Sequence, residues 1–179
     1  WDSKFHLLCA VIMSAQTTDR MVNRVMPSFS KEFPTPESLA DAPIEEIENE
    51  IKTIGLYRSK AKHLKATAQI LVDKYNSQVP KDKQILMTLP GVGEKTANVV
   101  LAEGYGVPAI AVDTHVSRIS KKFHIVDEKA TPHEVEKRLE AILPKDEWIK
   151  THHAMILFGR YTMPSKAKGD PYSYLNSQK

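Results

Sequence analysis

The segment 89–100 constrains the fold of this chain more than any other stretch, and it reads LPGVGEKTANVV. Gly91 and Gly93 lack a Cβ, so they tolerate positive φ and allow another backbone to approach closely. The string predicts a tight turn followed at once by a helix, whose first N–H groups are free to bind an anion such as phosphate. Lys95 lies in the first turn of that helix, where it could be an anchor for the anion or a nucleophile.

Helical periodicity dominates the rest of the chain. Apolar residues recur at helical spacing in 5–13 and 57–75, and a stripe of isoleucines stands at positions 44, 47, 51 and 54. No stretch alternates convincingly like a β-strand, although 109–112 is apolar and short enough to pass for one. Roughly ten helices with short connections favour an all-α fold.

Local signals predict where several helices begin and end. Asp82 and Asp113 each precede a short helical segment, and the TPHE string at 131–134 is a capping box with proline at the first helical position. Pro27 predicts a kink or a short break in the second helix. Gly159 predicts the end of the last long helix, which starts at about residue 146.

The composition permits a nucleic-acid partner without requiring one. The chain has 179 residues, enough for one large domain or two small lobes, and a net charge of +3. One charge run follows the outer face expected for the helix 57–75, and such a run predicts a solvated surface. Its members are Arg58, Lys60, Lys62, His63 and Lys65.

Cys9 is the only cysteine, and it stands in an apolar run. One cysteine cannot build a disulfide, a zinc site or an iron–sulfur cluster within one chain, so we expect Cys9 to be a core residue in a reducing, cytoplasmic setting. No apolar run approaches the roughly 20 residues that span a bilayer, so no membrane partner is expected. The first residues do not resemble a signal peptide, and without a starting methionine we expect a trimmed fragment.

Several strings together carry a family resemblance. The segment 83–100 resembles the helix-hairpin-helix module that grips a DNA backbone, and AVDTHVSR at 111–118 places a carboxylate after it. SAQTTD at 14–19, IGLY at 54–57 and GRYT at 159–162 complete a set in the right order. The set resembles the endonuclease III family of base-excision DNA glycosylases. The resemblance implies an all-α, two-lobed fold with a central DNA-binding cleft, formed by a helical barrel lobe (1–107) and a second lobe (108–179).

The resemblance also implies two catalytic residues. Lys95 matches the lysine whose amine attacks the sugar C1′ carbon, and Asp113 matches the catalytic carboxylate. A free lysine is almost entirely protonated at neutral pH, but a helix N-terminus disfavours another positive charge and partial burial disfavours any charge. Both effects would raise the fraction of free amine. The residues alone leave two alternatives open: Lys95 could only pair with phosphate, and Asp113 could only cap its helix.

Further residues match positions that contact DNA. Gln16 and Leu56 match the residues that push into the gap left by a flipped base, a task that suits an amide and a short apolar wedge. The alternative is that Leu56 is a core residue and Gln16 a helix cap. The expected DNA-binding set is completed by Leu89, Gly91, Val92, Gly93, Thr96 and His115. The adjacent histidines at 152 and 153 diverge on a helix and are expected to pack rather than bind metal.

The sequence departs from the family pattern at one place. Most relatives carry four cysteines after GRYT that hold a [4Fe–4S] cluster, whereas this chain has Met163 at the first position and no cysteine from there to residue 179. We therefore expect no cluster, and apolar packing of Met163, Trp148 and Phe158 in its place.

The expected activity is that of a monomeric, bifunctional DNA glycosylase and AP lyase of base excision repair. It would remove oxidised pyrimidines from damaged double-stranded DNA and nick the strand 3′ to the abasic site by β-elimination. Two alternatives remain: an adenine or mismatch-specific glycosylase of the same fold, and a non-catalytic helix-hairpin-helix DNA-binding module.

Overall fold

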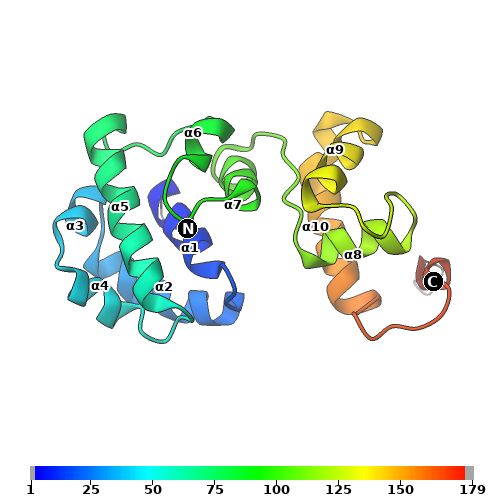
Figure 1. The fold of residues 1–179 in the computed structure, drawn as a ribbon, viewed down its shortest axis with the longest axis horizontal. Coiled ribbons are helices and arrows are strands. Elements are labelled where there is room, and N and C mark those ends of the chain that lie inside the picture. Colours follow the sequence, from blue (N-terminus) through cyan, green and yellow to red (C-terminus); the bar gives the residue numbers. More distant parts are fainter. Residues whose placement is uncertain (1–2, 176–179) are drawn as a thin grey trace. The chain divides into compact units, whose positions relative to one another are not determined.

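The computed structural model describes residues 3–175, and its regular secondary structure over that range is entirely helical (Figure 1). The prediction of an all-α fold is therefore confirmed. The chain divides into two compact units, Trp1–Tyr105 and Gly106–Lys179, and the division falls two residues before the lobe boundary expected from the sequence. No helix among residues 3–175 is long and apolar enough to cross a membrane.

The first unit packs its helices around the long helix α5. Helices α3 and α4 lie against α5, while α1 contacts α2, α5, α7 and η1. Fully buried Leu64 and Leu71 of α5 share the core with Phe29, Leu39 and Ile47 from the surrounding helices. The elements are α1 (Lys4–Ser14), α2 (Asp19–Glu32), α3 (Pro36–Asp41), α4 (Ile44–Glu50), α5 (Tyr57–Tyr75), α6 (Lys83–Met87), α7 (Glu94–Val99) and the π-helical turn η1 (Val100–Gly104).

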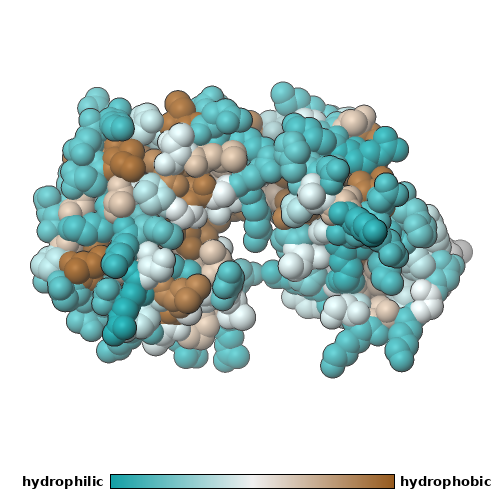
Figure 2. All heavy atoms as spheres, in the orientation of Figure 1, coloured by the Kyte–Doolittle hydropathy of each residue, from teal (hydrophilic) through white to brown (hydrophobic). Residues whose placement is uncertain are grey.

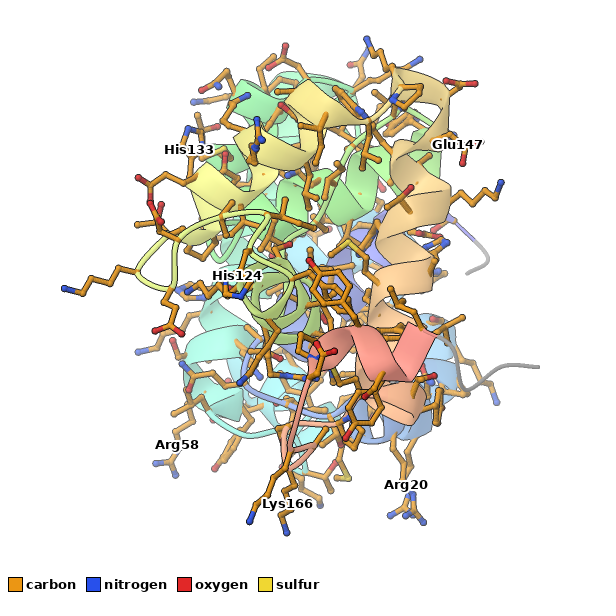
Figure 3. All side chains as sticks on the ribbon, turned by 90° about the vertical axis from the view of Figure 1, so that its right-hand side faces the viewer. Arg20, Arg58, His124, His133, Glu147 and Lys166 are labelled. Atoms are coloured by element: carbon orange, nitrogen blue, oxygen red, sulfur yellow. The ribbon has the colours of Figure 1, made fainter. Side chains whose placement is uncertain are left out.

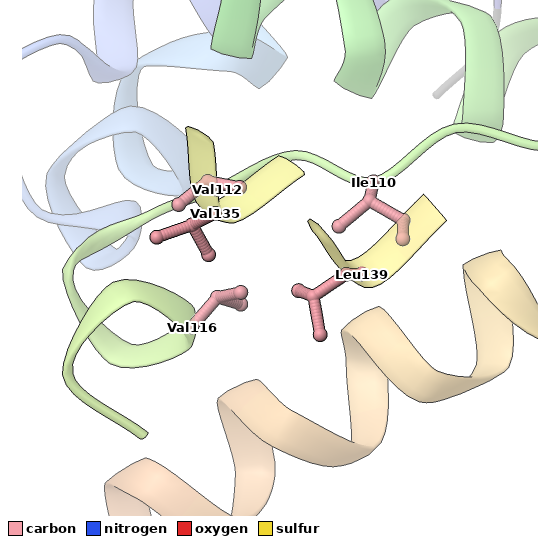
Figure 4. Close-up of a cluster of buried hydrophobic side chains, with 5 residues drawn as sticks. All are labelled: Ile110, Val112, Val116, Val135 and Leu139. Carbon is pink, nitrogen blue, oxygen red and sulfur yellow. The ribbon is translucent and has the colours of Figure 1, made fainter. Parts of the chain in front are cut away.

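The second unit has its own apolar core. Ile110 and Val112 of an extended segment, Val116 of α8, and Val135 and Leu139 of α9 converge on one point (Figure 4). The elements are α8 (Thr114–Lys122), α9 (Pro132–Ile142), η2 (Lys145–Glu147), α10 (Trp148–Leu157), η3 (Phe158–Thr162) and η4 (Pro171–Leu175).

Two expected helix breaks do not occur. α2 runs unbroken through Pro27, which lies on its exposed face. Asn23, whose carbonyl loses its intrahelical donor to the proline, is also exposed, so water can replace that bond. α10 continues through Gly159 into η3, so this glycine is not a helix stop. A Cβ on Gly159 would lie 3.0 Å from the Cβ of His115, and the residue therefore serves close packing of η3 on α8.

The segment 109–112 is buried but forms no strand. A strand needs a neighbouring strand to bond its backbone, and the described chain offers none. The expected apolar stripe of α4 is only partly helical: α4 ends at Glu50, and Ile51 and Ile54 continue into the core through turns.

Polar and aromatic contacts hold the C-terminal segment of the second unit. Arg118 donates to the carbonyl of Met163 at 2.7 Å and to that of Gly159 at 2.8 Å. The Phe123 ring contacts both Phe158 and Tyr172. Met163 is buried as expected. The last four residues of the tail, 176–179, lie outside the described residues.

Trp148 contributes elsewhere than expected. Its indole packs against the core formed by Ile110, Val112 and Leu139, and Nε1 donates to the Leu143 carbonyl. These contacts place Trp148, at the start of α10, with residues of the α8 and α9 core, whereas Met163 follows η3 beyond the other end of α10.

Cys9 should be chemically inert in the folded protein. Its side chain is 1% exposed, and burial raises the pKa of the thiol far above its ordinary value. The thiolate is the reactive form. Burial therefore keeps reagents away from the sulfur and also keeps the thiol protonated. We expect Ellman's reagent to titrate no thiol in native protein and one equivalent in denaturant. Rapid labelling of the native protein would contradict the burial.

Candidate active site

The glycine hairpin lies between α6 and α7. Asp82 caps α6 by accepting from the amide of Ile85 at 2.9 Å, and the turn closes where the amide of Val92 donates to the Leu89 carbonyl at 3.1 Å. The hydroxyl of Thr67, on α5, donates to the Pro90 carbonyl at 3.0 Å. The hairpin is therefore fastened to the longest helix of the unit rather than held only by its own two helices.

The two hairpin glycines meet different requirements. Gly91 has φ +79°, and a Cβ there would lie 3.0 Å from Nδ1 of His63. Gly93 has φ −94°, which any residue tolerates, and within the described part of the chain a Cβ there would meet nothing within 4 Å. Gly91 is thus required by the fold, while Gly93 leaves open space over an exposed turn.

Alanine substitutions should separate these two roles. Gly91→Ala is expected to destabilise the protein by about 1–3 kcal/mol, because a left-handed backbone is unfavourable for alanine and its Cβ would crowd the His63 ring. Gly93→Ala, the comparison variant, causes neither backbone strain nor a clash, so it should cost only the N-cap preference for glycine over alanine, about 1 kcal/mol or less. Denaturant unfolding measures both. Adding His63→Ala to Gly91→Ala should recover only the steric part; full recovery would contradict the backbone argument.

Leu89 and Val92 occupy the inner side of the hairpin. Their side chains are 2% and 6% exposed, so only their backbone atoms can meet a ligand. Thr96 is half-buried in the first turn of α7.

Lys95 is the second residue of α7 and its side chain is exposed. The expectation of partial burial is wrong for the free protein, because the residue extends from the solvent side of its short helix. Its place at the start of the helix agrees with the expectation. An exposed amine directly after an open, glycine-containing turn can reach a ligand that docks on the turn.

Asp113 caps α8 in the second unit. One carboxylate oxygen accepts from the amide of Val116 at 2.8 Å, and the side chain is half-buried. Buried Val112 precedes it, so the backbone leading into the cap is fixed on both sides. Capping occupies one oxygen with a neutral donor and leaves the carboxylate group available for other contacts.

His115 is integrated into the packing of the second unit. Its Nδ1 lies 3.4 Å from Nη2 of Arg118, and Gly159 lies directly against its Cβ. His152 is buried and its ring lies beside that of exposed His153, with centroids 5.2 Å apart.

Gln16 and Leu56 occupy the tips of two loops of the first unit. Both have left-handed backbones, with φ +53° and +59°, and the Leu56 side chain is 64% exposed. The core alternative for Leu56 is thus excluded. Gln16 is exposed between Ala15, the C-cap of α1, and Thr18, the N-cap of α2, so it caps neither helix.

The two loops lie side by side. A Cβ on Gly55, the neighbour of Leu56, would lie 3.7 Å from Oγ1 of Thr17 and 3.8 Å from the carbonyl of Gln16. Arg20 and Arg58, which follow the two tips by four and two residues, extend into solvent at the lower edge of Figure 3.

Figure 2 shows hydrophilic residues over most of the face it draws, with hydrophobic ones in small separate patches.

Lys60 is not on the solvent face of α5. Lys60 was expected on the outer face of the helix 57–75, but it is only 4% exposed and its Nζ donates to Met13 and Thr17. A signal was present: Lys60 stands four residues before Leu64, on the buried stripe of α5.

Comparisons with known proteins agree on one family. Residues 9–145 match the HhH-GPD superfamily base excision DNA repair protein family. Endonuclease III of Bacillus subtilis (strain 168) is 48% identical over 157 residues, which cover 88% of this chain and 72% of that protein. Endonuclease III of Escherichia coli (strain K12) is 42% identical over 162 residues, covering 90% and 76%. A solved structure of a trapped covalent intermediate of endonuclease III with DNA, an estranged-adenine complex, superposes with a TM-score of 0.89 at 49% identity, covering 92% of this chain and 78% of that one.

Proposed function

Because the chain belongs to the HhH-GPD superfamily of base excision DNA repair proteins, we propose that Lys95 and Asp113 carry out its reaction on a damaged base in duplex DNA. The protein is a DNA-binding DNA N-glycosylase and AP lyase of the endonuclease III type. The observation that carries the proposal is the exposed Lys95 in the first turn of α7, directly after a glycine turn with open space above it.

Lys95 is the proposed nucleophile. Its free amine forms a bond to C1′ of the sugar while the glycosidic bond breaks and the base leaves with a proton. Opening of the sugar ring then gives an iminium between Lys95 and C1′, with the ring oxygen protonated. The iminium acidifies the C2′ proton, and loss of that proton expels the 3′ phosphate by β-elimination. One amine therefore supports both base removal and strand nicking.

Asp113 is proposed as the carboxylate that supports these steps. A negative charge stabilises the positive charge that develops on the sugar, and a carboxylate can take protons from the attacking amine and return them. The hydrogen bond from the amide of Val116 restricts the side-chain rotamer, so the capping role and the chemical role are compatible.

The hairpin is proposed to bind a DNA phosphate through its backbone amides. Such contacts position the duplex without reading its sequence. Gly93 supports this role because, among residues 3–175, no atom outside its chain neighbours lies within 4 Å of a Cβ built there. The same Gly93→Ala variant, which should remain folded, is then expected to weaken binding to duplex DNA, since its methyl group would stand over the amides.

The proposed substrate is duplex DNA that contains an oxidised pyrimidine, acted on by a monomer in the cytoplasm. The test incubates the protein with duplexes bearing thymine glycol, an abasic site or an adenine mismatch, in the presence of borohydride. Adducts with thymine glycol and the abasic site support the proposal. Base removal from the adenine mismatch alone would favour the mismatch-specific alternative, and no adduct or base release with any duplex would leave only the binding module.

We also propose that this chain works without the iron–sulfur cluster of its relatives. A [4Fe–4S] cluster is held by cysteine thiolates. The segment 163–179 contains none, and Cys9 is buried in the first unit, so the residues present do not fit the cluster. The contacts of Arg118 and Phe123 hold the C-terminal segment instead.

Iron content tests this proposal. Protein purified without air and in the presence of iron and sulfide should contain well under one iron per chain and lack the broad visible absorption of a cluster. Chelator treatment should leave its thermal midpoint unchanged, because no metal bond contributes to folding. Four irons per chain would contradict the argument from ligands.

A further inference from the structure

Lys60 is an unusual buried cation. Its side chain is 4% exposed, and within residues 3–175 its Nζ donates to two neutral oxygens, the Met13 carbonyl and Oγ1 of Thr17, each at 2.8 Å. Burial lowers the pKa of this ammonium, so placing it here opposes folding. A buried lysine that lacks a carboxylate partner needs another reason for its position.

Lys60 makes hydrogen bonds next to both loop tips. Met13 and Thr17 lie on either side of Gln16, three residues before it and one after it. The backbone amide of Lys60 donates to the carbonyl of Leu56 at 3.1 Å. The side chain of Lys60 is thus bonded to the loop of Gln16. Its main-chain bond to Leu56 is the first-turn helix bond of α5, which any residue except proline would make.

The tips themselves are strained and exposed. A left-handed backbone is unfavourable for a residue that carries a Cβ, and both Gln16 and Leu56 have one. The Met13 carbonyl lies in the last turn of α1, where carbonyls lack intrahelical donors and a positive charge is favourable. The Lys60 side chain therefore supplies bonds that hold the loop of Gln16, and the loop of Leu56 packs on that loop through Gly55.

We propose that Lys60 is a positioning residue that holds Gln16 and Leu56 in the arrangement in which they enter the duplex and keep the target base out. The inference rests on the proposed function, in which these two tips fill the gap. Unstacking a base costs free energy. Side chains that must first become ordered would offset less of that cost than side chains already held in place.

The chain offers a matched control in the same helix. Lys65 of α5 donates through Nζ to the carbonyls of Ala40 and Ala42, each at 2.6 Å, at the end of α3. It too fastens a helix end, but away from both tips. Lys60→Met and Lys65→Met each remove an ammonium and two hydrogen bonds while keeping an unbranched side chain.

Two substrates separate positioning from general structural damage. On duplex DNA with thymine glycol, Lys60→Met is expected to slow single-turnover base release by roughly tenfold or more, equivalent to about 1.4 kcal/mol. On single-stranded abasic DNA no base must leave a stack, so the lyase rate should stay within about twofold. Lys65→Met should leave both rates near those of the unchanged protein. The fluorescence of 2-aminopurine beside the lesion should rise less with Lys60→Met than with Lys65→Met.

A double variant and a milder variant complete the test. If Lys60 acts through Leu56, Lys60→Met should slow base release by less than about twofold in a Leu56→Ala background. Thr17→Val removes one acceptor and leaves the lysine in place, so it keeps the proposal testable even if Lys60→Met unfolds. It should slow the duplex reaction by roughly threefold and spare the single-stranded one.

The outcomes distinguish this inference from the proposed function. Absence of a borohydride-trapped adduct with the unchanged protein on abasic DNA would overturn the proposed function itself. If trapping is intact, three results would overturn the role of Lys60 alone. The first is an equal loss of rate on duplex and single-stranded DNA, and the second is an equal loss of rate in Lys60→Met and Lys65→Met. The third is an unchanged rate on duplex DNA in both Lys60→Met and Thr17→Val.

Discussion

Replacing Lys95 by glutamine is expected to abolish the borohydride-trapped adduct with abasic DNA and to slow strand nicking by roughly a thousandfold or more, as removal of a covalent nucleophile does. Glutamine cannot form the iminium, so neither base displacement by the amine nor β-elimination has a route. Lys95 is exposed in the first turn of α7. The free energy of unfolding should therefore change by less than about 0.5 kcal/mol.

Gel analysis of trapped adducts and single-turnover nicking measure the effect of Lys95→Gln. Lys129→Gln, which changes an exposed lysine in a loop of the second unit, controls for the loss of one positive charge. An adduct that persists in Lys95→Gln would assign the attack to another amine. Weakened DNA binding with an unchanged rate at saturating protein would assign Lys95 to the phosphate-anchor role.

Asp113 allows its capping role and its chemical role to be separated. Asparagine can accept the hydrogen bond from the amide of Val116 but carries no charge. Asp113→Asn should therefore keep the thermal midpoint while slowing base release by roughly 10²–10⁴-fold, the size of a typical acid–base contribution. Asp113→Ala should slow base release by the same factor. It should also lower the free energy of unfolding by about 1 kcal/mol, because α8 loses its N-cap.

Single-turnover base release and thermal unfolding of both Asp113 variants measure these expectations. Asp82→Asn, which preserves the corresponding cap of α6, is the control for a charge lost at an N-cap. Full activity in Asp113→Asn, with a loss in Asp113→Ala that follows its stability, would reduce Asp113 to a structural cap.

The sequence predicted the local architecture well where the deciding contacts are close along the chain. The caps at Asp82 and Asp113 and the capping box of Thr131 and Glu134 each join residues three positions apart, so the residue types and their spacing suffice. The bounds of α5 could be read from its apolar stripe because a helix of that length repeats the pattern several times.

Prediction failed where a partner far along the chain decides. Gly159 has the residue type of a helix stop, yet it lies inside η3 because His115 and Arg118, over 40 residues away, need the space of a missing side chain. Lys60 has the residue type of a surface position, yet its partners are Met13 and Thr17. Neither contact produces a periodic pattern or a short motif in the sequence.

The sequence by itself determined that this chain folds as helices around a glycine turn, carries Lys95 in the first turn of the following helix, and lacks cysteines for a cluster. These properties depend on residue identity and on bonds between near neighbours. Only the tertiary structure decided that Gly91 must pack against His63, that Gln16 and Leu56 project as strained tips, and that a buried lysine fastens the loop of Gln16 beside that of Leu56. Packing settles such features, because burial and backbone strain depend on what the folded chain brings alongside.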